Sequence, residues 1–134
     1  MTTAWLILDS IKRRVGVAPS YGGKPVWQSV GERDREYVKA IADVLNTAGT
    51  QVQDVASVTV VQGTGGFSDT RSAVLFANTL AWQNKAVLRY EIRIDKGQEA
   101  QAPETEADYM ARAQEVSELK PVYFAEPNIT KPSK

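Results

Sequence analysis

The sequence predicts a single α/β domain, and three observations point to this fold class. A chain of 134 residues, 43% of them hydrophobic, can bury one core of normal size, whereas two full domains would both be marginal. Short apolar runs that end at polar or glycine-rich turns are typical of buried strands. Two longer segments repeat apolar residues at helical spacing. Strands and helices are therefore expected to share one core.

The opening of the chain is predicted to be an antiparallel meander. Residues 4–10, Ala-Trp-Leu-Ile-Leu-Asp-Ser, are almost wholly apolar, as in a strand buried on both faces. A second strand follows through 15–18 and reaches a glycine turn at 20–23, and a third strand covers 25–30. Pro25 indicates that the third strand begins at a sheet edge.

The clearest helical pattern follows, with apolar side chains recurring every three or four positions up to Ala48. Asp34 is the predicted N-cap and Gly49 the predicted C-cap of this first helix.

The middle of the chain reads as strand, glycine turn, helix and strand. A β-branched strand over 58–61 stops at Gly-Thr-Gly-Gly, residues 63–66. Ser68 is the predicted cap of a second helix that runs to about Gln83. A fifth strand covers 85–94, where apolar and charged residues are mixed as in a partly exposed strand.

We expect residues 1–95 to form the main lobe and residues 96–134 to add a linker, a short helix and an extended tail packed on the same domain. Residues 96–106 are polar, and a third helix is predicted over 106–119. Prolines punctuate the segment behind it, which therefore cannot be helical.

Composition excludes several functions. The chain has no histidine and no cysteine, which excludes Ser-His-Asp and Cys-His catalysis, disulfides and the commonest metal ligand. Basic and acidic residues number 16 each, so any contact with RNA has to be local or come through a partner. The apolar runs are far shorter than the ~20 residues of a membrane helix, and the first residues lack the basic segment of a signal peptide. We expect a cytoplasmic protein without membrane contact.

Two features could carry chemistry, and each also has a structural interpretation. The glycine turn before the second helix could hold a phosphate. A P-loop, however, has Lys and Ser or Thr after its last glycine, and here Phe67-Ser68-Asp69 follows, which places a carboxylate where phosphate would be repelled. A structural turn is the favoured interpretation.

Asp9, at the end of the first strand, could bind magnesium, but one carboxylate does not make a metal site. Glu36 and Asp43 lie on the first helix, where acids are usually solvated. We therefore predict no metal, no cofactor and no enzymatic activity.

The second helix is apolar on nearly every face, from Ala73 to Trp82. Since one apolar stripe suffices in a two-layer domain, this pattern implies a second cover. That cover is either another subunit or the third helix and tail of the same chain; the pattern favours neither.

Residues 61–71, Val-Gln-Gly-Thr-Gly-Gly-Phe-Ser-Asp-Thr-Arg, resemble the Gly-Pro-Gly-Ser-Phe-Thr-Gly-Leu-Arg signature of the TsaB (YeaZ) family. Residues 6–10, Leu-Ile-Leu-Asp-Ser, are similar to the family's Ile-Asp-Thr start, and residues 120–132 resemble its Pro-Val-Tyr-Leu-Arg tail. The motif positions that match in place are Gly63, Gly65, Phe67 and Arg71. The positions that depart from the motif are Thr64, Gly66, Asp69, Thr70 and Ser72.

The resemblance implies an ASKHA, ribonuclease H-like lobe with a five-stranded mixed sheet whose first three strands are antiparallel. Because few residues remain after the fifth strand, it implies a minimal form that lacks most of the family's second lobe. The implied function is that of a non-catalytic scaffold in the complex that makes threonylcarbamoyladenosine in tRNA. The implied partners are the catalytic paralogue TsaD and the ATPase TsaE, with tRNA contacted only indirectly.

The resemblance also implies that the first and second helices contact the partner, or a second copy in its absence. The residues expected at this contact are Tyr37, Val38, Ile41, Leu45, Ala73, Val74, Phe76, Ala77 and Leu80. Two alternatives remain: a stand-alone ASKHA nucleotide-binding module or enzyme, and a homodimeric binding protein that uses the same helical face.

Overall fold

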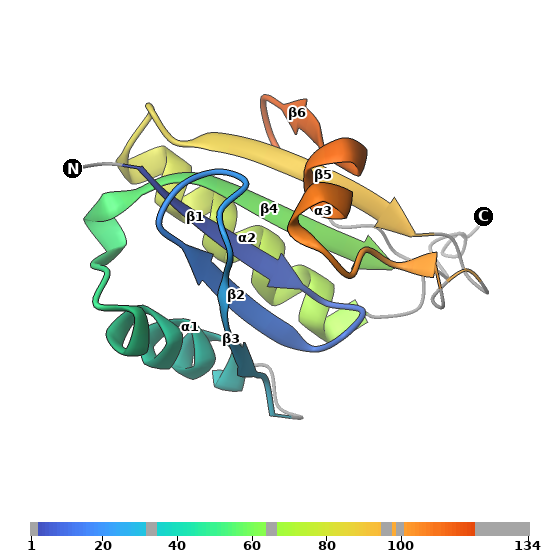
Figure 1. The fold of residues 1–134 in the computed structure, drawn as a ribbon, viewed down its shortest axis with the longest axis horizontal. Coiled ribbons are helices and arrows are strands. Elements are labelled where there is room, and N and C mark those ends of the chain that lie inside the picture. The colour runs from blue at the N-terminus through green and yellow to red at the C-terminus, as the bar shows by residue number, and fades with distance from the viewer. Residues whose placement is uncertain (1–2, 32–34, 64–66, 95–97, 99–100, 120–134) are drawn as a thin grey trace, which may run out of the picture.

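The computed structural model describes residues 3–31, 35–63, 67–94, 98 and 101–119, and a six-stranded mixed sheet is its central element. The strands are β1 (Ala4–Asp9), β2 (Arg14–Ala18), β3 (Val26–Ser29), β4 (Val55–Gly63), β5 (Leu88–Ile94) and β6 (Gln114–Val116). The helices are α1 (Arg35–Ala48), α2 (Phe67–Gln83) and α3 (Glu106–Arg112), and a 3₁₀ turn covers Val52–Asp54. The strand order is β3-β2-β1-β4-β5-β6, with α2 behind the sheet and α3 in front of it (Figure 1).

The predicted antiparallel opening is confirmed. β1 pairs antiparallel with β2, and β2 antiparallel with β3. The turn before β3 is closed by the bond from the Gly23 amide to the Ser20 carbonyl, 2.9 Å long. Gly22 lies in this turn with φ of 87°, a conformation that side chains resist, so glycine is required there.

β1 lies at the centre of the sheet and is buried on both faces, as its unbroken apolar run predicts. On the other side from β2 it pairs parallel with β4, and β4 pairs parallel with β5. Leu6 and Leu8 face the helical layer, whereas Trp5 and Ile7 face α3. The sheet therefore divides the core into two halves, one under α1 and α2 and one under α3.

The first helix is confirmed. It ends at Ala48, and Gly49 follows with φ of 68°, the left-handed conformation of a C-terminal cap. The amide of Thr50 bonds the carbonyl of Leu45 at 2.9 Å. The predicted N-cap, Asp34, lies outside the described residues.

Three boundaries differ from the predicted ones. β4 starts at Val55, three residues before the predicted strand, because its first residues also pair with β1. α2 already begins at Phe67, so Ser68 lies inside the helix and the prediction that it is the cap is wrong. β5 begins only at Leu88, because Asn84 forms a turn in which its side chain accepts a hydrogen bond from the Ala86 amide at 3.1 Å.

The predicted five strands become six because the third helix is shorter than expected. α3 ends at Arg112, and Ala113 is already extended. β6 then pairs antiparallel with Arg89–Glu91 of β5, and Val116 packs against the core under α1 and α2. An open strand edge and a β-branched side chain thus override the helical pattern. The proline-rich tail lies outside the described residues.

Within the described ranges, none of the helices combines the length and the apolar character that a bilayer crossing needs.

Candidate functional site

The predicted partner residues of α1 and α2 mostly face the chain's own sheet. Seven of the nine are buried, so their interpretation as an outward surface is corrected: Tyr37, Ile41, Leu45, Ala73, Val74, Ala77 and Leu80. Phe76 is half-buried and packs on the same core. Val38 alone is well exposed, at 56%. α1 packs on β2 and β3, and α2 packs on β4 and β5, so these side chains fill the core between the helices and the sheet.

The outer surface of the two helices is nevertheless apolar in part. Val38 and Ala42 of α1 are exposed, and so is Leu75 of α2, at 68%. We call these three residues the helical face. Trp82, two turns after Leu75, is 77% exposed. The excess apolarity of α2 is therefore explained only in part by the chain's own core.

The motif residues are placed differently from the prediction of a sharp glycine turn. Gly63 is the last residue of β4 and has no positive φ; its missing side chain makes room for Ile11. Phe67 starts α2, and Arg71 is exposed on it. Gly65 lies outside the described residues. At Gly63, close packing rather than turn geometry therefore requires glycine.

Asp9, the candidate magnesium ligand, is fully buried and has its oxygens occupied by hydrogen bonds. One oxygen accepts the amides of Ile11 and Lys12, both at 3.0 Å, which closes the turn into β2. The other accepts the hydroxyl of Tyr109 at 2.7 Å. The Tyr109 hydroxyl in turn accepts a bond from Arg14 at 3.1 Å, and the Arg14 guanidinium lies 3.7 Å from the centroid of the Trp27 ring.

This arrangement makes Asp9 the anchor of α3 on the sheet. Burial, and then the nearby Asp9 charge and its hydrogen bond, raise the pKa of Tyr109, so the hydroxyl stays protonated and donates. Tyr37 also lies near Asp9, and burial raises its pKa as well. The Asp9 carboxylate therefore has a structural role, in which it accepts hydrogen bonds from three donors.

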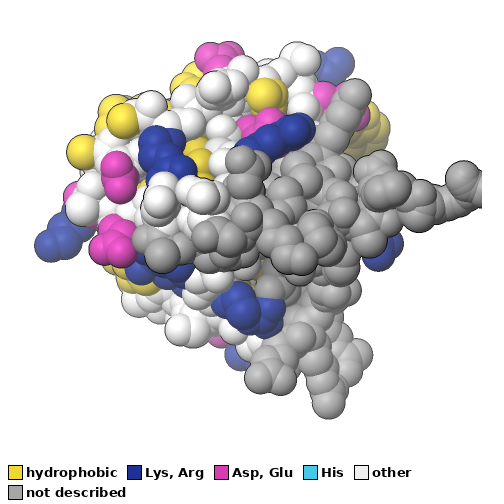
Figure 2. Space-filling model, turned by 90° about the vertical axis from the view of Figure 1, so that its right-hand side faces the viewer, with side chains coloured by type: hydrophobic (Ala, Val, Ile, Leu, Met, Phe, Trp, Pro, Cys, Tyr) yellow, Lys and Arg dark blue, Asp and Glu magenta, His cyan; other side chains and the backbone are white. Residues whose placement is uncertain are grey.

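Among the described residues, no other acids join Asp9 in a metal-ligand cluster. Asp43 pairs at 3.1 Å with Lys39 on the exposed side of α1, as expected for a solvated acid. Across the part of the chain that the structure describes, no three acidic side chains gather as metal ligands would. Figure 2 views the end of the sheet at which β1, β4 and β5 finish, and its coloured part intersperses basic with acidic side chains.

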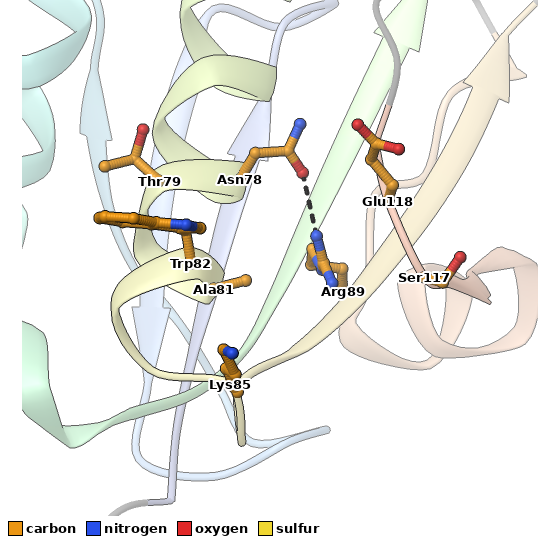
Figure 3. A pocket seen from close by; sticks show the side chains of 8 residues that line it. All are labelled: Asn78, Thr79, Ala81, Trp82, Lys85, Arg89, Ser117 and Glu118. Carbon is orange, nitrogen blue, oxygen red and sulfur yellow. Dashed lines mark hydrogen bonds between the residues drawn. The ribbon is translucent and has the colours of Figure 1, made fainter.

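A groove of about 620 Å³ lies at the other end of α2, bounded by the start of β5 and the residues after β6 (Figure 3). Arg89 donates to the Asn78 carbonyl oxygen at 3.3 Å. Trp82 and Thr79 lie on one side of it and Ser117 and Glu118 on the other. Its lining residues are Asn78, Thr79, Ala81, Trp82, Lys85, Arg89, Ser117 and Glu118.

Asn78 fastens the segment after β6 to α2. Its amide donates to the Leu119 carbonyl at 2.8 Å, and its oxygen accepts the Leu119 amide at 3.2 Å. Leu119 is thereby buried in the core under the helices. The sequence did not indicate this role, because in the sequence Asn78 is simply a polar residue within an otherwise apolar helix.

We expect Asn78→Leu to lower the free energy of unfolding by about 2–3 kcal/mol, because the Leu119 backbone groups and Arg89 lose their partner. Urea unfolding measures the change. Thr79→Leu, at the neighbouring exposed position, is the control and should change stability by less than about 0.5 kcal/mol. Equal stability of both variants would contradict the fastening role of Asn78.

The fold defines a class: a one-layer mixed sheet, opened by an antiparallel meander, with two crossing helices on one face. No family model matches the chain, and no curated protein matches it. Among solved structures, the chain is similar to YeaZ from Pseudomonas aeruginosa, with 20% identity, a TM-score of 0.51, and coverage of 69% of this chain and 44% of that one. It is equally similar to a protein described as uncharacterized, with similarity to peptidase YEAZ, from the same organism, at 20% identity, TM-score 0.51 and coverage of 69% and 43%.

The chain therefore has a YeaZ-like fold. It spans less than half the length of either solved structure.

Proposed function

We propose that this chain is a non-catalytic, TsaB-like scaffold that binds a TsaD-like partner through the helical face. The observation that carries the proposal is the exposure of Leu75 and Val38 on two helices that cover one face of a YeaZ-like sheet. An exposed apolar surface on paired helices favours helix packing from another protein. The matching motif positions in residues 61–71 support the same assignment.

The sequence resemblance to the TsaB family supplies the finer parts of the proposal. The lobe is of the ASKHA, ribonuclease H-like type, and the sheet order β3-β2-β1-β4-β5 agrees with it. The role lies in forming threonylcarbamoyladenosine in tRNA, in the cytoplasm, with tRNA and a TsaE-like ATPase reached through the partner. Absence of histidine and cysteine, and an Asp9 whose oxygens are occupied, support a role without catalysis.

We expect Leu75→Glu and Val38→Glu to weaken binding to the TsaD of the same organism at least about tenfold, because a carboxylate replaces buried apolar contact. Titration calorimetry with the wild-type complex as reference measures this. Val52→Glu is the matched control: Val52 is an exposed valine in the 3₁₀ turn, outside both helices, and its substitution should leave binding unchanged.

Circular dichroism should show all three variants folded, since each side chain is exposed. Undiminished TsaD binding by both helix variants would overturn the proposed face. If TsaD does not bind the wild-type chain while Leu75→Glu converts a dimer into a monomer on a sizing column, the homodimeric alternative is supported instead.

A further inference from the structure

The groove at the carboxyl end of α2 lies beside an exposed tryptophan and has features that the scaffold role does not explain. Trp82 is 77% exposed beside it, which is unusual for the largest apolar side chain. Leu75, another exposed apolar residue of α2, lies two turns away and does not line the groove. The indole therefore offers a free aromatic surface next to a concave one.

The groove also holds two cations, Lys85 and Arg89, together with one carboxylate, that of Glu118. In the described part of the chain, neither Lys85 nor Arg89 forms an ion pair, although Glu118 lines the same groove. Arg89 is half-buried, and its hydrogen bond goes to the neutral Asn78. A guanidinium has five N–H donors, and this bond to a neutral amide oxygen uses one of its nitrogens.

The aromatic ring, the two cations and the carboxylate occupy different parts of the groove. Figure 3 shows the Trp82 ring edge-on, with Thr79 on one side of its plane and Lys85 on the other. Arg89 lies between α2 and the segment of Ser117 and Glu118. An aromatic face, a cationic pair and a carboxylate opposite them thus line one groove of about 620 Å³, a volume suited to a small molecule.

We propose that this groove binds a nucleoside monophosphate. The base stacks on the face of Trp82 turned toward Lys85, the phosphate reaches Lys85 and Arg89, and Glu118 accepts hydrogen bonds from the ribose hydroxyls. A bare anion would leave Trp82 unused, and an uncharged ring would leave both cations unpaired. The acidic Glu118 and the carboxyl end of α2 keep the affinity modest.

Titration calorimetry on the full chain tests the proposal with adenosine 5′-monophosphate, adenosine and ribose 5-phosphate. We expect the monophosphate to bind at least about tenfold more tightly than either fragment, because each fragment uses only part of the groove. Trp82→Ala should weaken the monophosphate about tenfold and leave ribose 5-phosphate unchanged. Lys85→Gln should weaken both phosphates severalfold and leave adenosine unchanged.

Matched controls separate the groove from the rest of the surface. Leu75→Ala removes another exposed apolar side chain of α2, and Lys39→Gln removes the charge of another lysine; both lie outside the groove and should leave all affinities as in the wild type. No binding of the monophosphate at about 10 mM, equal affinity for the monophosphate and ribose 5-phosphate, or an unchanged affinity in Trp82→Ala would each overturn the proposal. Leu75→Glu, which tests the helical face, should bind the monophosphate normally, so the two proposals fail separately.

Discussion

Replacing Ala77 by glutamate is expected to unfold the chain. Ala77 is completely buried where α2 meets the sheet, and Ala73 lies one turn earlier in the same core. A carboxylate at either position meets only apolar neighbours, and its added volume has no space in a close-packed interior. We expect each change to cost about 4 kcal/mol or more, which is a large part of the stability of a small domain.

The measurement is thermal unfolding followed by circular dichroism, with Leu75→Glu as the matched control. Leu75 lies on the same helix but is 68% exposed, so that variant should melt within a few degrees of the wild type. If Ala77→Glu remained folded with an unchanged melting temperature, α2 would have to present a different side to the sheet.

Removing the Asp9 carboxylate is expected to be nearly as damaging. Asp9→Ala leaves two amides of the turn after β1 and the Tyr109 hydroxyl without their acceptor. Each buried donor left unpaired costs about 1–3 kcal/mol, so we expect a loss of about 3 kcal/mol or more. Tyr109→Phe removes one donor and keeps the packing, so its cost should be about 1–2 kcal/mol.

A double-mutant cycle in urea separates the shared bond from the rest. Because Asp9 and Tyr109 contact each other, the double variant should be more stable than the sum of the single changes predicts, by about 1 kcal/mol. Strict additivity would contradict the 2.7 Å bond between them. Asp43→Ala, which removes an exposed carboxylate, is the control and should change stability by less than about 1 kcal/mol.

Much of the fold could be predicted from local patterns. The unbroken apolar run of β1 indicated burial on both faces, and Gly49 marked the end of α1. These predictions are confirmed because they depend only on residues close together in the sequence, through their spacing and backbone conformation.

The features of the fold that were not predicted depend on contacts between residues far apart in the sequence. β6 forms because Gln114–Val116 can pair with the open edge of β5. No local pattern in the sequence predicts this pairing. For the same reason the outward and inward sides of α2 could not be separated: Leu75 and Ala77 are both apolar, and only the position of the sheet decides which is buried.

At the candidate sites too, single residues could be picked out from the sequence, but their contacts with distant residues could not be predicted. Asp9 was recognised as exceptional, but its three donors were not, since Tyr109 reaches it from a helix far along the chain. Trp82 was counted as one more apolar residue of a helix, and Lys85 and Arg89 as residues of a strand. Their convergence on one groove requires the turn at Asn84, which follows α2 and delays the start of β5 from the predicted residue 85 to Leu88.

The bond between Asp9 and Tyr109 also bears on the order of folding. The two residues are 100 positions apart, yet Asp9 belongs to the central strand. During synthesis, β1 and β2 emerge long before Tyr109, so one oxygen of the buried carboxylate lacks its partner until α3 has been made. Closing a loop of that length costs entropy before the contact repays it. The contact between α3 and the central strand therefore forms only after residue 109 has been synthesised, later than the pairing of β1 with β2 can form.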